Sequence, residues 1–367
     1  MLEDSSRSAN SDKFLDLHSK LTFISSENPE LIFNNLHLFT INESSNCHLV
    51  DLTFEQFSEN LTHPPFVIKR FHEYTYIVDI LEKISPHIKD WIDFLDLNHL
   101  HPTLYPDIPG LDRLCRCLYI AESIYLAHKN NYQLVFILPA PTFSLRLFDD
   151  LIQAPELLNL IFNPLLAWWD ETCKNLKGLN TFLRLNLPSS SNISLSKKWK
   201  KIIVHTASML KSYENYKFIC GLNTEHCTTS DFNLKLLNTS FHSPMIYSYL
   251  FYGSNSFEIG THFTKYSPYV TLLPLANSSY LHSVGIIFPN NILLKEVSSD
   301  GTTKSIQIFV PGYVGTKPQI IQHKNKVYLL HKGHRKCIYL SDYGIFEDVN
   351  CSGAKLTDGT LTIEFCS

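Results

Sequence analysis

The sequence predicts an α/β protein in which a mostly parallel, doubly wound sheet is followed by a small all-β sandwich. Three observations support this fold class. Residues 134–138 form an uninterrupted apolar run that leads through two prolines into an apolar helical pattern, as buried strands of parallel sheets do. Further strands alternate with helical patterns along most of the chain. Beyond residue 283, short strands separated by turn residues replace the helical periodicity.

Composition indicates a folded chain with room for two domains. The chain has 367 residues, 44% hydrophobic and 18% charged, so it can bury a sizeable core. Its formal net charge of −4 gives no indication of a nucleic-acid partner. No apolar run reaches the roughly 20 residues that a membrane-spanning helix needs, so we do not expect an integral membrane protein.

Cysteine usage favours a reducing compartment. The nine cysteines have no regular spacing, and the amino terminus lacks the charged-then-apolar pattern of a signal peptide. We therefore expect a cytoplasmic protein, or one of the plastid stroma. His99, His101, Cys115 and Cys117 do not match the spacing of a standard zinc site, so no metal is predicted.

The first half of the chain predicts these elements in order. Residues 1–18 are polar and serine-rich, which is typical of a disordered tail. A strand at 21–25 ends in the turn 26–29, and a second strand covers 47–52. A helix with one apolar face begins after the Pro-Gly pair at 109–110.

The second half continues the alternation and then changes character. A helix is predicted from 197 to about 213, with strands at 216–223 and 244–251. From residue 305 onwards, short strands alternate with Gly-containing turns. The predicted domains are the tail 1–18, an α/β domain at 19–282 and a β-sandwich at 283–367.

The segment after the strand at 134–138 carries the most specific resemblance. Ala140, Pro141, Thr142 and the Leu-Arg-Leu of 145–147 resemble the second switch region of the ArsA family, the anion-pump and tail-anchored-protein-targeting ATPases. The family ends this strand in an aspartate, whereas this chain has Leu138, and the family's glycine and histidine are absent.

Other parts of the family's nucleotide site are changed as well. The turn before Pro29 resembles the first switch region, with Asn28 in the position of the catalytic aspartate. The family's glycine-rich phosphate loop is expected before residue 21, but the first 20 residues contain no glycine, which close wrapping of a phosphate requires. The resemblance therefore implies a sheet of P-loop-NTPase type that lacks the P-loop, with no catalytic residue and no cofactor. The degenerate nucleotide site would consist of Asn28, Leu138, Pro141 and Thr142.

The carboxyl-terminal strands carry a second resemblance. Residues 334–338 and 358–365 resemble the α-crystallin-like sandwich, of small heat-shock-protein type, that is fused to some ArsA relatives. Such fusions occur mainly in photosynthetic lineages, so the resemblance implies a chaperone-like protein of cyanobacterial or plastid origin.

An unusually apolar segment follows the region that resembles the second switch. Two interpretations are open: a helix buried in the core or at a dimer contact, and an exposed face that binds apolar segments. In the targeting ATPases, helices of this region help to line a groove for a client transmembrane helix. The resemblance therefore implies a protein partner or an apolar helix as ligand, with a homodimer also possible. The residues of this predicted face are Leu157, Leu158, Ile161, Phe162, Leu165, Trp168 and Trp169.

Three functions remain open from the sequence. The preferred hypothesis is an ArsA-like pseudo-ATPase that binds a protein partner or apolar segment without hydrolysing ATP. The second is an ATPase of this family that uses ATP and Mg²⁺, with its P-loop missing from this chain or supplied by a partner subunit. The third is a purely structural subunit.

Overall fold

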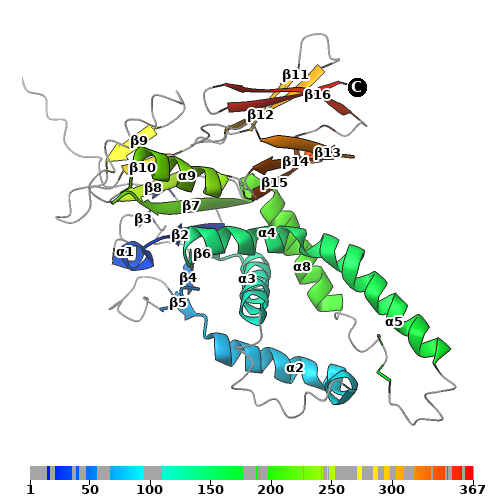
Figure 1. Cartoon of the computed structure of the whole chain (residues 1–367). Coiled ribbons are helices and arrows are strands. Elements are labelled where there is room, and N and C mark those ends of the chain that lie inside the picture. Colours follow the sequence, from blue (N-terminus) through cyan, green and yellow to red (C-terminus); the bar gives the residue numbers. More distant parts are fainter. Residues whose placement is uncertain are drawn as a thin grey trace, which may run out of the picture. The chain divides into compact units, whose positions relative to one another are not determined.

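A computed structural model describes the chain in segments (Figure 1). The chain divides into two compact units. The sheet unit comprises Met1–Lys69, Tyr132–Arg146 and Lys211–Ser367. The helical unit comprises Arg70–Asn131 and Leu147–Leu210. The described residues are 15–16, 21–34, 39–40, 47–55, 67–94, 110–176, 187–188, 190, 197–225, 227–240, 242, 246, 248–252, 271–274, 284–287, 293–297, 303–309, 318–331, 334–343, 345, 349–357 and 360–366.

An eight-stranded sheet lies in the sheet unit, with the strand order β5-β4-β6-β2-β7-β8-β10-β9. The pairs from β4 to β8 are parallel, whereas β10 is antiparallel to both of its neighbours. The predicted α/β class with a mostly parallel sheet is therefore confirmed. The strands are β2 (Leu21–Ser26), β4 (Cys47–Asp51), β5 (Val67–Arg70), β6 (Gln133–Leu138), β7 (Tyr216–Asn223), β8 (Ser248–Tyr252), β9 (Thr271–Pro274) and β10 (Val284–Ile287).

The central strands are apolar because neighbouring strands and both sheet faces enclose them. Every residue of β2 and β6 is buried, which explains the uninterrupted apolar run at 134–138. Phe23 pairs in register with Phe136 on one side and Phe218 on the other. The centroid of the Phe23 ring lies 4.9 Å from that of Phe136 and 6.4 Å from that of Phe218. This aromatic row fixes the register of the three strands.

The connections of β2 and β7 leave the sheet in opposite directions. From β2 the chain runs through α1 (Pro29–Asn34) to β4, and from β7 it runs through α9 (Thr229–Ser240) to β8 on the other side. Since β2 and β7 are adjacent and parallel, their carboxyl ends form a topological switch point. In open α/β sheets, ligands bind in the crevice at such a point.

The helical unit contains long helices held together by polar and aromatic contacts. The buried Arg116 guanidinium lies 3.0 Å from the Glu73 carboxylate and 4.9 Å from the centre of the Phe71 ring. The Thr206 hydroxyl donates a hydrogen bond of 3.3 Å to the Ala121 carbonyl, which links two helices. The helices are α2 (Glu73–Phe94), α3 (Leu111–Asn130), α4 (Pro141–Leu157, which begins in the sheet unit), the π-helix η5 (Leu158–Phe162), α5 (Asn163–Asn175) and α8 (Lys197–Lys211).

Two small antiparallel sheets occupy the carboxyl-terminal part. Their orders are β11-β12-β17-β16 and β13-β14-β15, and both contribute to one hydrophobic cluster that includes Ile306, Val327 and Phe365. The predicted boundary at residue 283 stays a prediction, and β10, which follows it directly, pairs with the large sheet. The strands are β11 (Leu293–Val297), β12 (Thr303–Phe309), β13 (Gln319–His323), β14 (Lys326–His331), β15 (His334–Tyr339), β16 (Asn350–Thr357) and β17 (Thr360–Cys366).

The predicted tail lies mostly outside the described residues, except that β1 (Leu15–Asp16) pairs with β3 (Phe39–Thr40). Two short 3₁₀ helices, η6 (Tyr213–Asn215) and η7 (Leu340–Tyr343), also belong to the described part of the chain. Among the helices that the structure describes, none is long and apolar enough to cross a membrane.

Gly221 allows β7 to approach β2 closely at the switch point. A Cβ atom added there would lie 2.7 Å from the Ser26 hydroxyl oxygen and 3.0 Å from the Ser26 Cβ. We expect Gly221→Ala to lower the free energy of unfolding by about 1–3 kcal/mol, because backbone or hydrogen-bonded atoms must shift. Gly353→Ala is the matched control, since its added Cβ meets only the Glu364 carboxylate at 3.6 Å. Equal denaturation midpoints for both variants would contradict the close approach.

The surroundings of His205 predict that the stability of the helical unit depends on pH. Its ring centroid lies 4.8 Å from that of His128, and burial, then His128 and Lys201, lower the pKa of His205 below 6.5. The unfolded chain therefore binds more protons near this pH, so this contribution to stability is lost as the pH falls below about 6.5. We expect the thermal midpoint to fall less in His205→Phe than in wild type on acidification. Equal falls of the midpoint in the variant and in wild type would contradict this role of His205.

Candidate functional site

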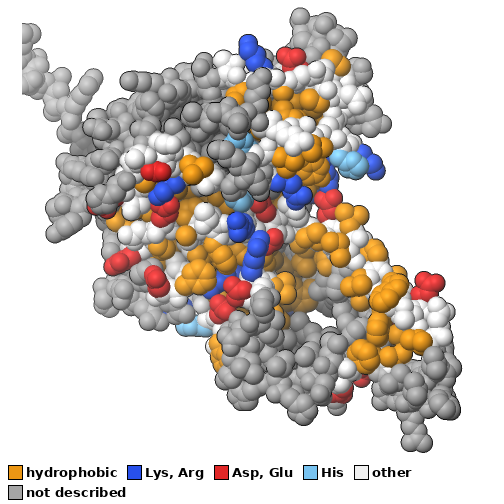
Figure 2. All heavy atoms as spheres, viewed as in Figure 1, with side chains coloured by type: hydrophobic (Ala, Val, Ile, Leu, Met, Phe, Trp, Pro, Cys, Tyr) orange, Lys and Arg blue, Asp and Glu red, His pale blue; other side chains and the backbone are white. Residues whose placement is uncertain are grey.

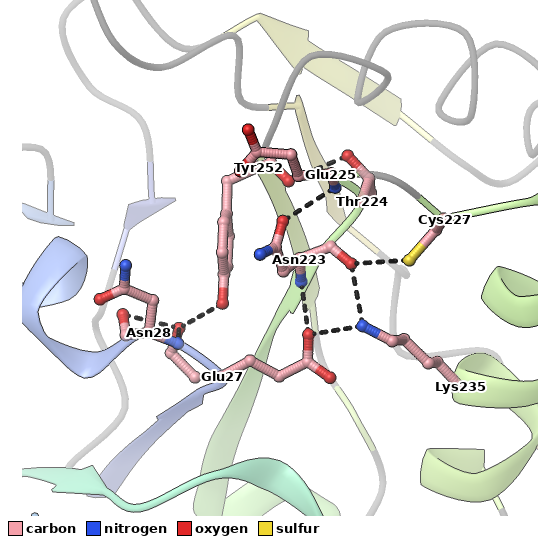
Figure 3. Close-up of polar contacts among 9 residues, drawn as sticks. Glu27, Asn28, Asn223, Thr224, Glu225, Cys227, Lys235 and Tyr252 are labelled. Carbon is pink, nitrogen blue, oxygen red and sulfur yellow. Dashed lines mark hydrogen bonds and ion pairs between the residues drawn. The ribbon is translucent and has the colours of Figure 1, made fainter.

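Polar side chains gather at the carboxyl ends of β2, β7 and β8, at the switch point (Figure 3). They come from the last residues of these three strands, the turns after β2 and β7, and the helix α9. We call this group the carboxyl-edge cluster. Its members are Ser26, Glu27, Asn28, Asn223, Thr224, Glu225, Cys227, Lys235 and Tyr252.

Glu27 connects three elements of this cluster. Its backbone N–H donates to the Gly221 carbonyl at 3.1 Å, which extends the contact between β2 and β7 beyond the ladder. Its carboxylate oxygen Oε2 accepts one hydrogen bond from the Asn223 backbone N–H at 2.8 Å and another from the Lys235 ammonium at 2.9 Å. The ammonium also donates to the Asn223 carbonyl at 3.1 Å. Thus Glu27 ties the β2–α1 turn to β7 and α9.

The charge of Lys235 is maintained by its neighbours. Burial disfavours the ammonium, but the hydrogen bond and charge of Glu27, followed by the effect of Cys227, outweigh it and raise the pKa of Lys235. Lys235 is therefore a cation at neutral pH rather than a nucleophilic amine. The pair remains partly accessible, with side-chain exposures of 32% for Lys235 and 30% for Glu27.

A capping box positions α9, and with it Lys235. The Thr228 hydroxyl donates to the Asp231 carboxylate at 2.6 Å, and the Asp231 backbone N–H donates to the Thr228 hydroxyl oxygen at 3.2 Å. The hydrogen bonds from the Thr228 side chain and then its backbone lower the pKa of Asp231. Lys235 follows one helical turn later, so its side chain is projected from a fixed helix start.

Tyr252 forms the β8 side of the cluster. Its hydroxyl lies 3.2 Å from the Ser26 hydroxyl oxygen, which in turn accepts the Asn28 backbone N–H at 3.0 Å. Burial is the main cause that raises the pKa of Tyr252, so the phenol is neutral. Its carbonyl accepts both the Thr224 backbone N–H, at 2.8 Å, and the Thr224 hydroxyl, at 2.9 Å. These bonds fix the turn after β7.

The structure brings part of the predicted degenerate nucleotide site together. Ser25 of β2 pairs with Leu138 of β6, so the two strands are adjacent. Leu138 is the last residue of β6, and Asn28 lies in the turn after β2. The Asn28 side-chain oxygen accepts the Leu31 N–H at 3.2 Å, which caps α1. Pro141 is buried and Thr142 is exposed, both in the first turn of α4.

The turn between β6 and α4 is held by hydroxyl groups. The Ser25 hydroxyl donates to the Pro139 carbonyl at 2.6 Å, and the Ser144 hydroxyl donates to the same oxygen at 2.8 Å. Both serines are fully buried. These side chains therefore stabilise the turn where the resemblance would place a switch region.

The turn between β2 and α1 differs from a phosphate loop. Only Glu27 and Asn28 separate Ser26 from Pro29, and α1 has six residues. Phosphate loops wrap the anion in successive backbone N–H groups at the start of a helix. Here the turn has no glycine, and Glu27 itself places a carboxylate at this edge.

Sequence reasoning missed two features of this edge. Asp51 ends β4, is fully buried, and accepts the Thr53 N–H at 2.9 Å and the Thr53 hydroxyl at 2.6 Å. The signal was present, because the predicted strand 47–52 contains an aspartate near its carboxyl end. The Glu27–Lys235 pair had no sequence signal, because its members are 208 positions apart.

The residues considered for zinc do not form a site within the described ranges, where no group of three or more potential ligands could hold a metal ion. His99 and His101 lie outside these ranges. Burial raises the pKa of the Cys115 thiol to about 11, and burial followed by Asp150 raises that of Cys117 to about 12. Both are therefore neutral thiols.

The predicted apolar face lies on the end of α4, η5 and α5. Several of its side chains are exposed, at 45% for Leu157, 60% for Ile161, 55% for Leu165 and 59% for Trp168. Leu160 of the same apolar segment is 65% exposed. These five residues belong to one continuous helical segment, and we call them the apolar stripe. Figure 2 shows hydrophobic side chains gathered over α5.

Other members of the predicted face have different surroundings. Leu158 is partly buried. Trp169 is also partly buried, its indole N–H donates to the Pro188 carbonyl at 2.8 Å, and its ring meets the edge of Phe94. The side chain of Phe162 lies outside the described part. The five residues of the apolar stripe, in contrast, are 45% to 65% exposed, which excludes their burial in the core.

The π-helix has a local cause. Pro164 has no N–H to donate to the Leu160 carbonyl, so the regular α-helical bond is impossible there. The helix widens directly before the proline, and the Asn163 N–H donates to the Leu158 carbonyl five positions back.

No protein-family model matches this chain, and its sequence matches no curated protein. The resemblances to the ArsA family and to the α-crystallin-like sandwich therefore stay predictions that rest on the quoted motifs.

Proposed function

We propose that this protein binds an apolar helical segment of a partner protein on the apolar stripe, and that it does so without hydrolysing ATP. The exposure of the stripe is the observation that carries this proposal. Exposed apolar patches of this kind on folded proteins commonly mark interaction sites.

The chemistry of the stripe fits an uncharged partner helix. Residues 157–169 contain no charged side chain, so a charged partner face would lose solvation without gaining an ion pair. The stripe extends over about 18 Å, at about 1.5 Å per residue. Exposed leucine, isoleucine and tryptophan side chains along one helical segment can pack against the apolar face of a partner helix. Trp168 supplies a large, rigid anchor near one end.

The carboxyl edge supports the second part of the proposal. Leu138 occupies the end of β6 and Asn28 lies in the β2–α1 turn, so both positions lack the aspartate that the resemblance places there. We further propose that the sheet descends from a P-loop-NTPase type of the ArsA kind and that the carboxyl-terminal sheets form a chaperone-like, α-crystallin-like sandwich. A reducing compartment such as the cytoplasm or stroma is consistent with nine cysteines that lie in described segments and form no disulfide.

The double variant Leu165→Ser and Trp168→Ser tests the stripe. Both side chains are more than half exposed, so we expect the free energy of unfolding to change by less than about 1 kcal/mol. We expect its affinity for an uncharged hydrophobic helical peptide to fall at least about tenfold, because exposed aromatic anchors dominate such contacts. Fluorescence titration with labelled peptide gives the affinity, and thermal unfolding gives the stability.

The matched control is Leu114→Ser with Val204→Ser. These residues are 53% and 55% exposed and lie on other helices of the helical unit. This control should bind the peptide as wild type does. Equal loss of binding in both double variants would refute the stripe. Self-association of the wild type that disappears in the stripe variant, without peptide binding, would identify a second copy as the occupant and overturn the proposal.

Nucleotide turnover provides a separate test. We expect no Mg²⁺-dependent ATP hydrolysis above a matched blank, because neither the β2–α1 turn nor the end of β6 holds the groups that this chemistry needs. Phosphate release during incubation with ATP measures it. Hydrolysis that persists through successive purification steps and disappears in Glu27→Ala would support the alternative ATPase.

A further inference from the structure

We propose that Glu27 is a built-in occupant of an oxyanion-binding position at the switch point, and that it keeps this position closed to phosphate and other free oxyanions. This inference goes beyond the proposed binding of an apolar helix. It concerns the sheet unit, whereas the stripe belongs to the helical unit, so each proposal can fail alone.

The contacts of Glu27 are those that a bound oxyanion would make. Two donors converge on its oxygen Oε2, the Asn223 backbone N–H at 2.8 Å and the Lys235 ammonium at 2.9 Å (Figure 3). A backbone N–H together with a lysine is a combination that proteins use to hold phosphate and carboxylate groups. The location is the topological switch point, where open α/β sheets bind their ligands.

Both donors are held by contacts that do not involve Glu27. The Asn223 side-chain oxygen accepts the Glu225 N–H at 2.8 Å, and Asn223 pairs with Tyr252 of β8. Lys235 projects from α9, whose start is fixed by its capping box, and its ammonium also bonds the Asn223 carbonyl. Removal of the Glu27 carboxylate therefore leaves a preorganised pair of donors.

Tethering explains why the wild type excludes free anions. The Glu27 carboxylate is attached to the turn directly after β2, so its effective concentration at the donors is at least in the millimolar range. A free oxyanion must compete with this concentration, and the unpaired carboxylate would then repel it. The donors are nevertheless reachable, because the side chains of Glu27 and Lys235 are about one-third exposed.

Glu27→Ala tests this inference with inorganic phosphate as the probe. Thermal midpoints are measured in increasing phosphate at constant ionic strength, for wild type and variant. We expect the variant to gain a saturable rise in its midpoint and to bind phosphate at least about tenfold more tightly than wild type, because ligand binding to the folded state stabilises it. Acetate, which resembles the deleted carboxylate, should stabilise the variant more weakly.

Two further variants make the result decisive. Glu214→Ala removes one exposed negative charge outside the carboxyl-edge cluster and should respond as wild type does. Glu27→Ala combined with Lys235→Met should lose the phosphate response. The inference is overturned if Glu27→Ala responds no more than Glu214→Ala, or if the response survives in the combined variant. Should Glu27→Ala fail to fold, Glu27→Ser also removes the acceptor oxygen from the two donors, and an unchanged phosphate affinity in it would be equally decisive.

Discussion

The enclosure of β2 between β6 and β7 is the constraint on which the rest of the sheet unit depends. Both backbone edges of β2 pair with parallel neighbours, and all six of its side chains are buried. Large apolar residues such as Phe23 are therefore required in its centre, and a small neighbour, Gly221, is required opposite its end. This arrangement places the β2–α1 turn at the carboxyl edge of the sheet, where the Glu27 carboxylate pairs with the Lys235 ammonium.

The Glu27–Lys235 pair affects which ligand can bind at the switch point more than it affects the stability of the sheet unit. Ion pairs with exposed or partly exposed side chains contribute about 0–1 kcal/mol, since water and ions screen them. The hydrophobic core of the sheet unit does not depend on so small a contribution to the free energy of unfolding. The same pair, however, decides which charge stands at the switch point and which donors are already engaged. Its principal effect is therefore on ligand selection, whereas the stability of the sheet comes from buried strands such as β2 and β6.

The sequence alone predicted the parts of the fold that depend on local patterns. The strand at 134–138 was predicted because buried parallel strands are continuous apolar runs. The pairing of β10 with β8 was not predicted, because strand order depends on contacts distant in sequence. The exposure of Leu165 and Trp168 was also left open, since the same apolar periodicity suits a core helix and a binding face. Likewise, no local signal joined Glu27 to Lys235.

The π-helix at Leu158–Phe162 has a geometric consequence for the helix that carries the stripe. A widened turn inserts about one extra residue, which rotates everything after it by about 100° around the helix axis. Pro164 thereby sets the rotational phase of α5 relative to α4. The direction in which Trp168 points, compared with Leu157, is determined by a missing amide hydrogen rather than by any contact of the two side chains. The amide hydrogen that Pro164 lacks thus sets how the two ends of the apolar stripe, about three helical turns apart, are rotated relative to each other.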